Sequence, residues 1–116
     1  MIFSNHTEDG INTQLERLKL VPYFALVRAN TIKSGSNFSG KKHTWVREYF
    51  DASRLAPREA LIIGDSPEET RIGKELGLVT VAITMGEYDT AKLKQAKPDH
   101  LITKVSELIE IIKEYD

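Results

Sequence analysis

One stretch of the sequence, residues 60–84, constrains the fold more than any other part: ALIIGDSPEETRIGKELGLVTVAIT. It has two apolar runs of strand length on either side of a polar stretch with apolar side chains at helical spacing. Ser66 and Pro67 are typical of a helix start, and Gly77 is typical of a helix end. Continuous apolar strands are typical of a sheet covered on both faces. The stretch therefore predicts a strand, a helix and a second strand parallel to the first.

The same alternation of strand and helix patterns continues along the whole chain. We expect strands at 2–4, 24–27, 60–64, 79–84 and 100–102. We expect helices at 8–19, 41–52, 67–76 and 88–96 and a final helix capped by Ser106 or Thr103, with Thr7 capping the first and a loop over 30–40. The last helix is expected to bury Val105, Leu108, Ile109 and Ile112. This order predicts an α/β fold in which helices cover both faces of a mainly parallel sheet.

Length, charge and cysteine content limit the possible functions. A chain of 116 residues is long enough for one domain, over residues 1–116, and too short for two. The net charge of −1, with both signs mixed, gives no support to nucleic-acid binding. The lack of cysteine fits a reducing cytosol, and no apolar run approaches the ~20 residues of a membrane span. We therefore expect a cytoplasmic protein that binds neither nucleic acid nor membrane.

Two carboxylates follow the central apolar strand. Asp65 comes at its carboxyl end, where ligands bind in parallel sheets, and Glu69 comes four residues later. Both can point at one small volume, and oxygen ligands suit a hard cation such as Mg²⁺. Alternatively, Asp65 and Ser66 only start a helix whose dipole is complemented by Glu68 and Glu69.

Two further pairs of residues point to an anionic ligand. Ser4 and Asn5 offer a hydroxyl and backbone N–H groups close to a predicted helix start, which is typical of an anion site. The alternative is an ordinary helix cap. Lys41 and Lys42 open the next helix, where positive charge is unfavourable for the helix dipole. That position favours an anionic partner, although two solvated lysines are the alternative.

Taken in order, these motifs resemble the haloacid dehalogenase (HAD) superfamily, and its phosphoglycolate-phosphatase-like branch in particular. The resemblance rests on Ser-Asn after a strand, a lysine after a loop, and the stretches GDSPEETRIGKELGLVTVAITMG and KPDHLI. It implies a three-layer Rossmann-like core and Mg²⁺-dependent hydrolysis of a small phosphorylated molecule. It also implies that Ser4 holds the transferring phosphoryl group and that Asn5 shapes the loop. Lys41, or alternatively Lys42, would neutralise phosphate charge.

The same resemblance assigns the metal. Asp65 would bind Mg²⁺, whereas Glu69 stands where the family usually has a second Asp. With its longer side chain, Glu69 would reach the metal only through water.

The family's first motif, Asp-x-Asp, does not occur in these 116 residues. That motif supplies the nucleophilic aspartate, so we expect a truncated core that is inactive alone yet binds phosphate and Mg²⁺ weakly. The family's first central strand and its cap domain, which carries much of the substrate specificity, are missing with it. The alternatives are the complementing subunit of a split phosphatase, or a non-enzymatic module that binds a phospho-ligand or a protein.

A missing central strand leaves two inner sheet edges with unpaired backbone groups. Three arrangements would satisfy them. The strand at 2–4 pairs directly with the strand at 60–64, a second copy of the chain fills the gap, or a separate polypeptide supplies the strand. We therefore expect a homodimer, a rearranged monomer or a complex with a partner.

Overall fold

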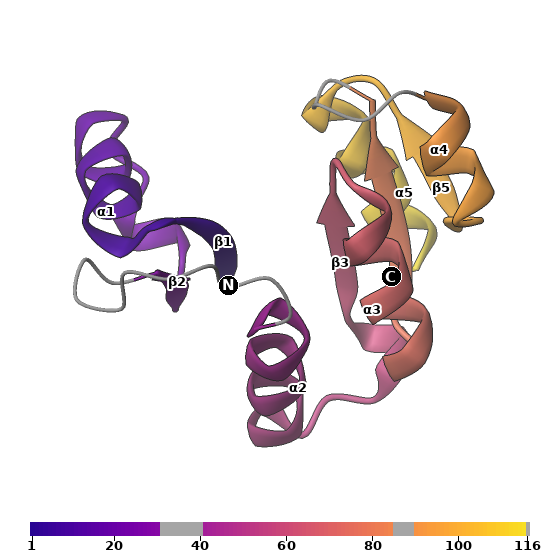
Figure 1. Cartoon of the computed structure of the whole chain (residues 1–116), viewed down its shortest axis with the longest axis horizontal. Coiled ribbons are helices and arrows are strands. Elements are labelled where there is room, and N and C mark those ends of the chain that lie inside the picture. The colour runs from indigo at the N-terminus through magenta and orange to yellow at the C-terminus, as the bar shows by residue number, and fades with distance from the viewer. Residues whose placement is uncertain (31–40, 85–89, 116) are drawn as a thin grey trace. The chain divides into compact units, whose positions relative to one another are not determined.

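The computed structural model describes residues 1–30, 41–84 and 90–115, and the chain divides into two compact units, Met1–Ser53 and Arg54–Asp116 (Figure 1). We refer to them as unit 1 and unit 2. The loop expected over 30–40 lies outside the described residues, except for Asn30, which belongs to a strand. None of the helices in the described ranges is long and apolar enough to span a membrane.

In the described residues of unit 1, 1–30 and 41–53, there are a two-stranded parallel sheet and two helices. Its elements are β1 (Ile2–Thr7), α1 (Glu8–Arg17), a 3₁₀ turn (Val21–Tyr23), β2 (Val27–Asn30) and α2 (Lys41–Ser53). The expected cap is confirmed, because the Thr7 hydroxyl accepts a hydrogen bond from the Gly10 N–H at 3.2 Å.

The second strand begins later than expected, so its predicted position at 24–27 is wrong. Pro22 lies in the 3₁₀ turn, whose last hydrogen bond runs from the Phe24 N–H to the Val21 carbonyl. Phe24 is left 36% exposed, and pairing with β1 starts where the Leu26 carbonyl accepts from the Ile2 N–H at 2.9 Å. The apolar run located a strand nearby, but the turn decides which of its residues can pair.

Unit 2 contains a three-stranded parallel sheet in the order β3-β4-β5. Its strands are β3 (Leu61–Gly64), β4 (Val79–Ile83) and β5 (His100–Ile102), and its helices are α3 (Pro67–Leu76), α4 (Thr90–Gln95) and α5 (Leu108–Glu114). All five residues of β4 are buried, as expected for a central strand covered on both faces. The expected helix end at Gly77 is confirmed by its left-handed backbone, with φ of 77°.

Helices cover both faces of the unit 2 sheet, as the sequence predicts (Figure 1). Gly73 of α3 lies against Ile62 and Thr80, which are register partners in β3 and β4 and share one face. The other face carries a core cluster that includes Ile111 of α5: Val81, Ile83, Ile102 and Ile111, with Leu61, Ile63 and Leu108 packed against it. Unit 2 thus has three layers, and the α/β class with parallel sheets is confirmed.

The apolar stripe expected on the last helix is wrong in phase. Ile111 is buried and Leu108 packs beside it, whereas Val105, Ile109 and Ile112 are 61%, 57% and 49% exposed. The segment begins with a 3₁₀ turn at Val105–Glu107, which has three residues per turn. A single 3.6-residue period counted from Val105 therefore runs out of step with the α-helix that follows.

Asp99 ties together the starts of β4 and β5. Its Oδ2 accepts hydrogen bonds from the Thr80 N–H (2.9 Å) and hydroxyl (3.1 Å), and the Asp99 N–H donates to the Thr80 hydroxyl oxygen (2.8 Å). The Thr80 N–H is the main reason that the pKa of Asp99 lies below its ordinary value. Arg58 adds a weaker contribution at 3.9 Å.

The end of α5 is tied to the same region through Tyr115. Its hydroxyl lies 3.0 Å from His100 Nε2, and the two rings pack edge to face with centroids 5.9 Å apart. The Arg58 guanidinium lies 5.7 Å from the centroid of the Tyr115 ring, within cation–π range. Two elements distant in the sequence, the 3₁₀ turn at Pro57–Glu59 and the last helix, thus meet at the start of β5.

Candidate functional site

The junction between β3 and α3 carries the predicted cation site. β3 ends at Gly64, Asp65 follows, and Ser66 is the cap of α3 with an extended backbone (φ −126°, ψ 162°). Pro67 then starts the helix, as expected. Asp65 therefore lies beyond the carboxyl end of a parallel strand, with its side chain exposed.

Glu69 is turned back toward this junction. The residue is only 4% exposed, and its Oε2 accepts hydrogen bonds from the Ser66 N–H (3.2 Å) and the Ser66 hydroxyl (2.5 Å). A carboxylate at the third helical position that satisfies an N–H of the cap is half of a capping box. The contacts of Glu69 therefore match the helix-start alternative that the sequence left open.

Gly64 makes room for the Glu69 side chain. A Cβ atom placed on Gly64 would overlap the Glu69 side chain. It would lie 2.6 Å from the Cβ of Glu69 and 2.5 Å from the carboxyl carbon of Glu69. Real Cβ atoms do not approach other carbons so closely, so only glycine fits at this end of β3.

The fit of a hard cation to this junction is therefore unequal for the two carboxylates. Asp65 offers an exposed carboxylate, and Mg²⁺ is commonly held by one or two carboxylates together with water and substrate phosphate. Within residues 1–30, 41–84 and 90–115, no three or more His, Cys, Asp or Glu side chains group as a metal site would require. The residues present fit a cation held by Asp65, and they do not fit direct ligation by Glu69 in this conformation.

Ser4 and Asn5 lie within β1, which is longer than expected. Phe3 pairs with Arg28 and Thr7 pairs with Asn30, so three residues of β1 oppose a single residue of β2. The helix starts at Glu8, as expected, but Ser4 and Asn5 lie within the bulged strand and not at the helix N-terminus, so that part of the expectation is wrong.

The Ser4 hydroxyl lies inside the bulge. Its oxygen accepts a hydrogen bond from the His6 N–H at 3.1 Å. The bulge sets residues 4–6 apart from regular pairing, a feature often found near active sites. The phosphate-binding roles of Ser4 and Asn5 stay predictions.

Lys41 and Lys42 open α2, the position that the sequence predicts for them. They belong to unit 1 with Ser4 and Asn5, whereas Asp65 and Glu69 belong to unit 2. The residues that the structure demonstrably brings together are thus those of the β3–α3 junction. The charge-neutralising role of Lys41, or of Lys42, stays a prediction.

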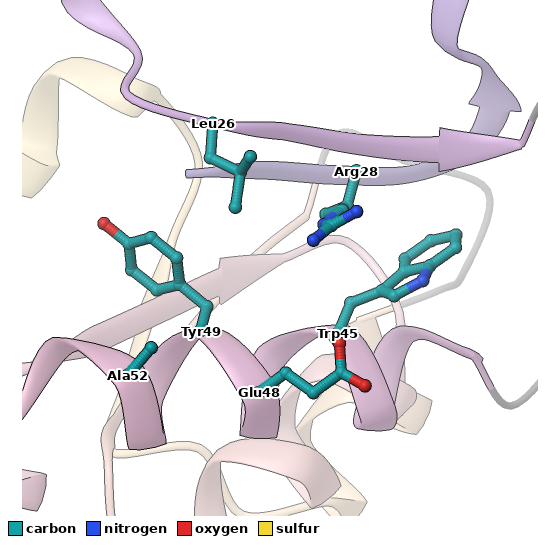
Figure 2. A pocket seen from close by; sticks show the side chains of 6 residues that line it. All are labelled: Leu26, Arg28, Trp45, Glu48, Tyr49 and Ala52. Carbon is teal, nitrogen blue, oxygen red and sulfur yellow. The ribbon is translucent and has the colours of Figure 1, made fainter.

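A pocket in unit 1 was not foreseen. It has a volume of about 290 Å³ and is lined by Leu26, which precedes β2, by Arg28 of β2, and by Trp45, Glu48, Tyr49 and Ala52 of α2. Figure 2 shows the rings of Trp45 and Tyr49 rising from α2 toward the strand that carries Arg28. The signal in the sequence was the spacing of Trp45 and Tyr49, four residues apart and hence on one helix face.

The family to which these features belong is shown by comparison with known proteins. The sequence model of the HAD-hydrolase-like family matches residues 38–108, which is more than half of the chain and includes the whole β3–α3 junction. The chain is therefore a member of the HAD-hydrolase-like family.

Curated relatives agree with this membership. The phosphoglycolate phosphatase of Synechococcus elongatus is 25% identical over 111 residues, which are 96% of this chain and 50% of that protein. PpaX of Caldanaerobacter subterraneus, a pyrophosphatase by name, is 37% identical over 62 residues, or 53% of this chain and 28% of that protein. The chain thus spans at most half the length of these relatives.

Solved structures agree on the fold. A predicted phosphatase from Clostridium acetobutylicum has a TM-score of 0.77 at 21% identity, covering 96% of this chain and 50% of its own. A haloacid dehalogenase-like hydrolase from Streptococcus pneumoniae has a TM-score of 0.70 at 24% identity, covering 94% and 50%. The Rossmann-like fold expected from the resemblance is thereby confirmed.

Proposed function

We propose that this chain provides the cation- and phosphate-binding part of a HAD-like phosphatase core that hydrolyses small phosphate esters in the cytoplasm. The observation that carries the proposal is the β3–α3 junction, where Asp65 is exposed beyond a buried parallel strand inside the family-matched region. The likeness to a phosphoglycolate phosphatase supports a small phosphate monoester as substrate.

In this proposal each candidate residue has a separate task. The Asp65 carboxylate would hold Mg²⁺, and the bound ion would offset negative charge on the phosphoryl group. The Ser4 hydroxyl would donate a hydrogen bond to a phosphoryl oxygen, in a loop shaped by Asn5. Lys41, or Lys42, would place an ammonium group against the phosphate.

The proposal includes the absence of turnover by these 116 residues alone. No Asp-x-Asp is present in them, and phosphoryl transfer without its nucleophile loses most of its rate. Binding uses other groups, so weak affinity for phosphate and Mg²⁺ would persist. The lack of Asp-x-Asp in these residues also leaves two alternatives. The chain would be one subunit of a split phosphatase, or a non-enzymatic module that binds a phospho-ligand or a protein.

The edge of the unit 2 sheet offers a place for the missing strand. Among the described residues, β3 has β4 as its hydrogen-bonded neighbour on one side only. A second copy of the chain or a partner polypeptide would add a parallel strand beside β3 and satisfy its N–H and C=O groups. Light scattering on the purified chain separates a dimer from a monomer awaiting a partner.

An activity assay tests the proposed function. The chain is incubated with Mg²⁺ and p-nitrophenyl phosphate, with and without a separately made strand peptide containing Asp-x-Asp. Turnover only in the mixture supports the phosphatase core, and turnover by the chain alone contradicts the stated inactivity. Tight binding of phosphate esters with no turnover in either case favours the non-enzymatic module.

The Asp65→Asn variant tests the cation role. We expect its Mg²⁺ affinity, measured by calorimetry, to fall by about tenfold or more, because the amide oxygen lacks the charge that a hard cation prefers. Circular dichroism should match the parent protein, since Asp65 is exposed. Asp51→Asn, the same change on the exposed side of α2, is the control and should leave Mg²⁺ affinity unaltered. Equal affinities of Asp65→Asn and the parent would contradict the role.

A further inference from the structure

We infer that Glu69 is a positioning residue that holds the loop carrying Asp65, and that it is not itself a cation ligand. The inference rests on the proposed function only for the role of Asp65. It replaces the water-mediated metal role that the resemblance implied for Glu69. Three features of the junction carry it: the hydrogen bonds of Glu69, its contact with Gly64, and the contrast in exposure with Asp65.

The first feature is that Glu69 bonds the residue immediately after Asp65. Both the N–H and the hydroxyl of Ser66 donate to the same oxygen, Glu69 Oε2, at 3.2 Å and 2.5 Å. These two hydrogen bonds fix the backbone of Ser66, and that backbone determines the direction in which Asp65 leaves the strand.

The second feature is that Glu69 also packs on the residue immediately before Asp65. Its side chain fills the space that a Cβ on Gly64 would occupy. The same carboxylate arm therefore holds Gly64 by van der Waals contact and Ser66 by hydrogen bonds. Asp65 lies between these two fixed points, so its position depends on the side chain of Glu69, a residue that is only 4% exposed.

The third feature is the opposite exposure of the two carboxylates. Glu69 is 4% exposed, whereas Asp65 is exposed at the surface. Oε2 already accepts from both Ser66 donors, so ligation through this oxygen would take an acceptor from the Ser66 N–H at the start of α3, and a residue that is 4% exposed offers little of its carboxyl group to an ion. Asp65 needs no such change. The two residues therefore have different roles: Asp65 presents an oxygen to the ion, and Glu69 holds Asp65 in place.

Hydrogen exchange at the Ser66 amide tests this role without any metal. In EDTA-containing buffer, Glu69→Ala should exchange this amide about tenfold faster than the parent protein, because its acceptor is gone. Glu69→Gln keeps an oxygen acceptor and should stay within about threefold of the parent. Glu114→Ala removes an exposed glutamate from α5 and is the control, with no effect at Ser66. An unchanged rate in Glu69→Ala, or equal rates in Glu69→Ala and Glu69→Gln, would overturn the inference.

A Mg²⁺ titration separates positioning from ligation. The probe is the ¹³C shift of the Asp65 carboxyl group as MgCl₂ is added. Glu69→Gln should keep the titration midpoint within about threefold of the parent, since the loop is still held. A midpoint raised by about tenfold or more would instead make Glu69 a ligand and overturn the inference. If the parent shows no response, the cation role of Asp65 fails, and the exchange rates at Ser66 still decide the role of Glu69.

Discussion

The two units of this chain differ in how much apolar structure supports their candidate residues. Among the described residues, the buried apolar side chains of unit 1 are Leu15, Ala29 and Val46. Those of unit 2 are Ile62, Ile72, Leu78, Val79, Val81, Ala82, Ile83, Leu93, Ile102 and Ile111. Unit 1 has a two-stranded sheet with a bulge, whereas unit 2 has three strands in regular register around a buried centre.

The candidate residues of the two units therefore have unequal structural support. A two-stranded sheet is marginal by itself, and the bulge at Ser4 removes further pairing. Asp65, by contrast, follows a strand paired to the fully buried β4. We therefore expect the surroundings of Asp65 to be rigid in the isolated chain and those of Ser4 and Asn5 to depend on additional contacts.

The largest expected effect comes from emptying the core of unit 2. Leu93→Ala removes a side chain that is 0% exposed and should lower the free energy of unfolding of unit 2 by about 2–5 kcal/mol. In a urea titration, the NMR signal of the Val81 amide reports the unfolding of unit 2. The fluorescence of Trp45, the single tryptophan, reports the unfolding of unit 1.

The matched change in unit 1 is Leu15→Ala, at a side chain that is 7% exposed. Because Leu15 has fewer buried neighbours, the loss of unfolding free energy should be at the low end of that range, about 2 kcal/mol. Should Leu15→Ala prove as costly as Leu93→Ala, the contrast between the units would be wrong.

A second comparison uses one substitution at two glycines. Gly64→Ala should destabilise unit 2 by about 1–3 kcal/mol, because the new methyl group overlaps the buried Glu69 side chain. In Gly10→Ala the new methyl group meets the ring of exposed His6 at 2.6 Å and the Thr7 hydroxyl at 2.9 Å. The helix propensity gained there, about 1 kcal/mol, roughly offsets a disturbed cap. Thermal unfolding measures both, and equal losses at the two sites would contradict the contrast.

The smallest effect is the pH dependence contributed by Asp99. Its pKa is lowered in the folded state, mainly by the Thr80 N–H, so its carboxylate stabilises unit 2 above the ordinary pKa of 3.8. That contribution is lost as the pH falls below 3.8 through the lower folded-state pKa. Asp99→Asn should cost about 1 kcal/mol at pH 7, because it weakens a charge-assisted bond.

Urea unfolding at several pH values checks this sign. The stability difference between the parent and Asp99→Asn should shrink in acid. A difference that grows on acidification would contradict the assigned cause.

The parts of the fold that the sequence predicted are those with local causes. Thr7, Ser66 with Pro67, and Gly77 mark helix ends through contacts within a few residues, and all lie where expected. The buried strand at β4 was equally readable, because a continuous apolar run allows little else.

The errors came from features that a repeating pattern does not contain. The 3₁₀ turn around Pro22 displaced β2, and a second 3₁₀ turn changed the phase of α5. The bond between Asp99 and Thr80 joins residues 19 apart, beyond the reach of helix or strand spacing. For the candidate site, the sequence predicted that Asp65 lies at the end of a strand. It could not predict the burial of Glu69, because that depends on how closely α3 packs against the sheet.

The ring of Tyr115 connects the end of α5 to two other parts of unit 2. It contacts His100 and Arg58 together, one residue beyond the end of α5. Removal of this ring would free the last turn of α5 from both contacts at once, so a Tyr115→Ala variant should loosen the end of α5 and the start of β5 together.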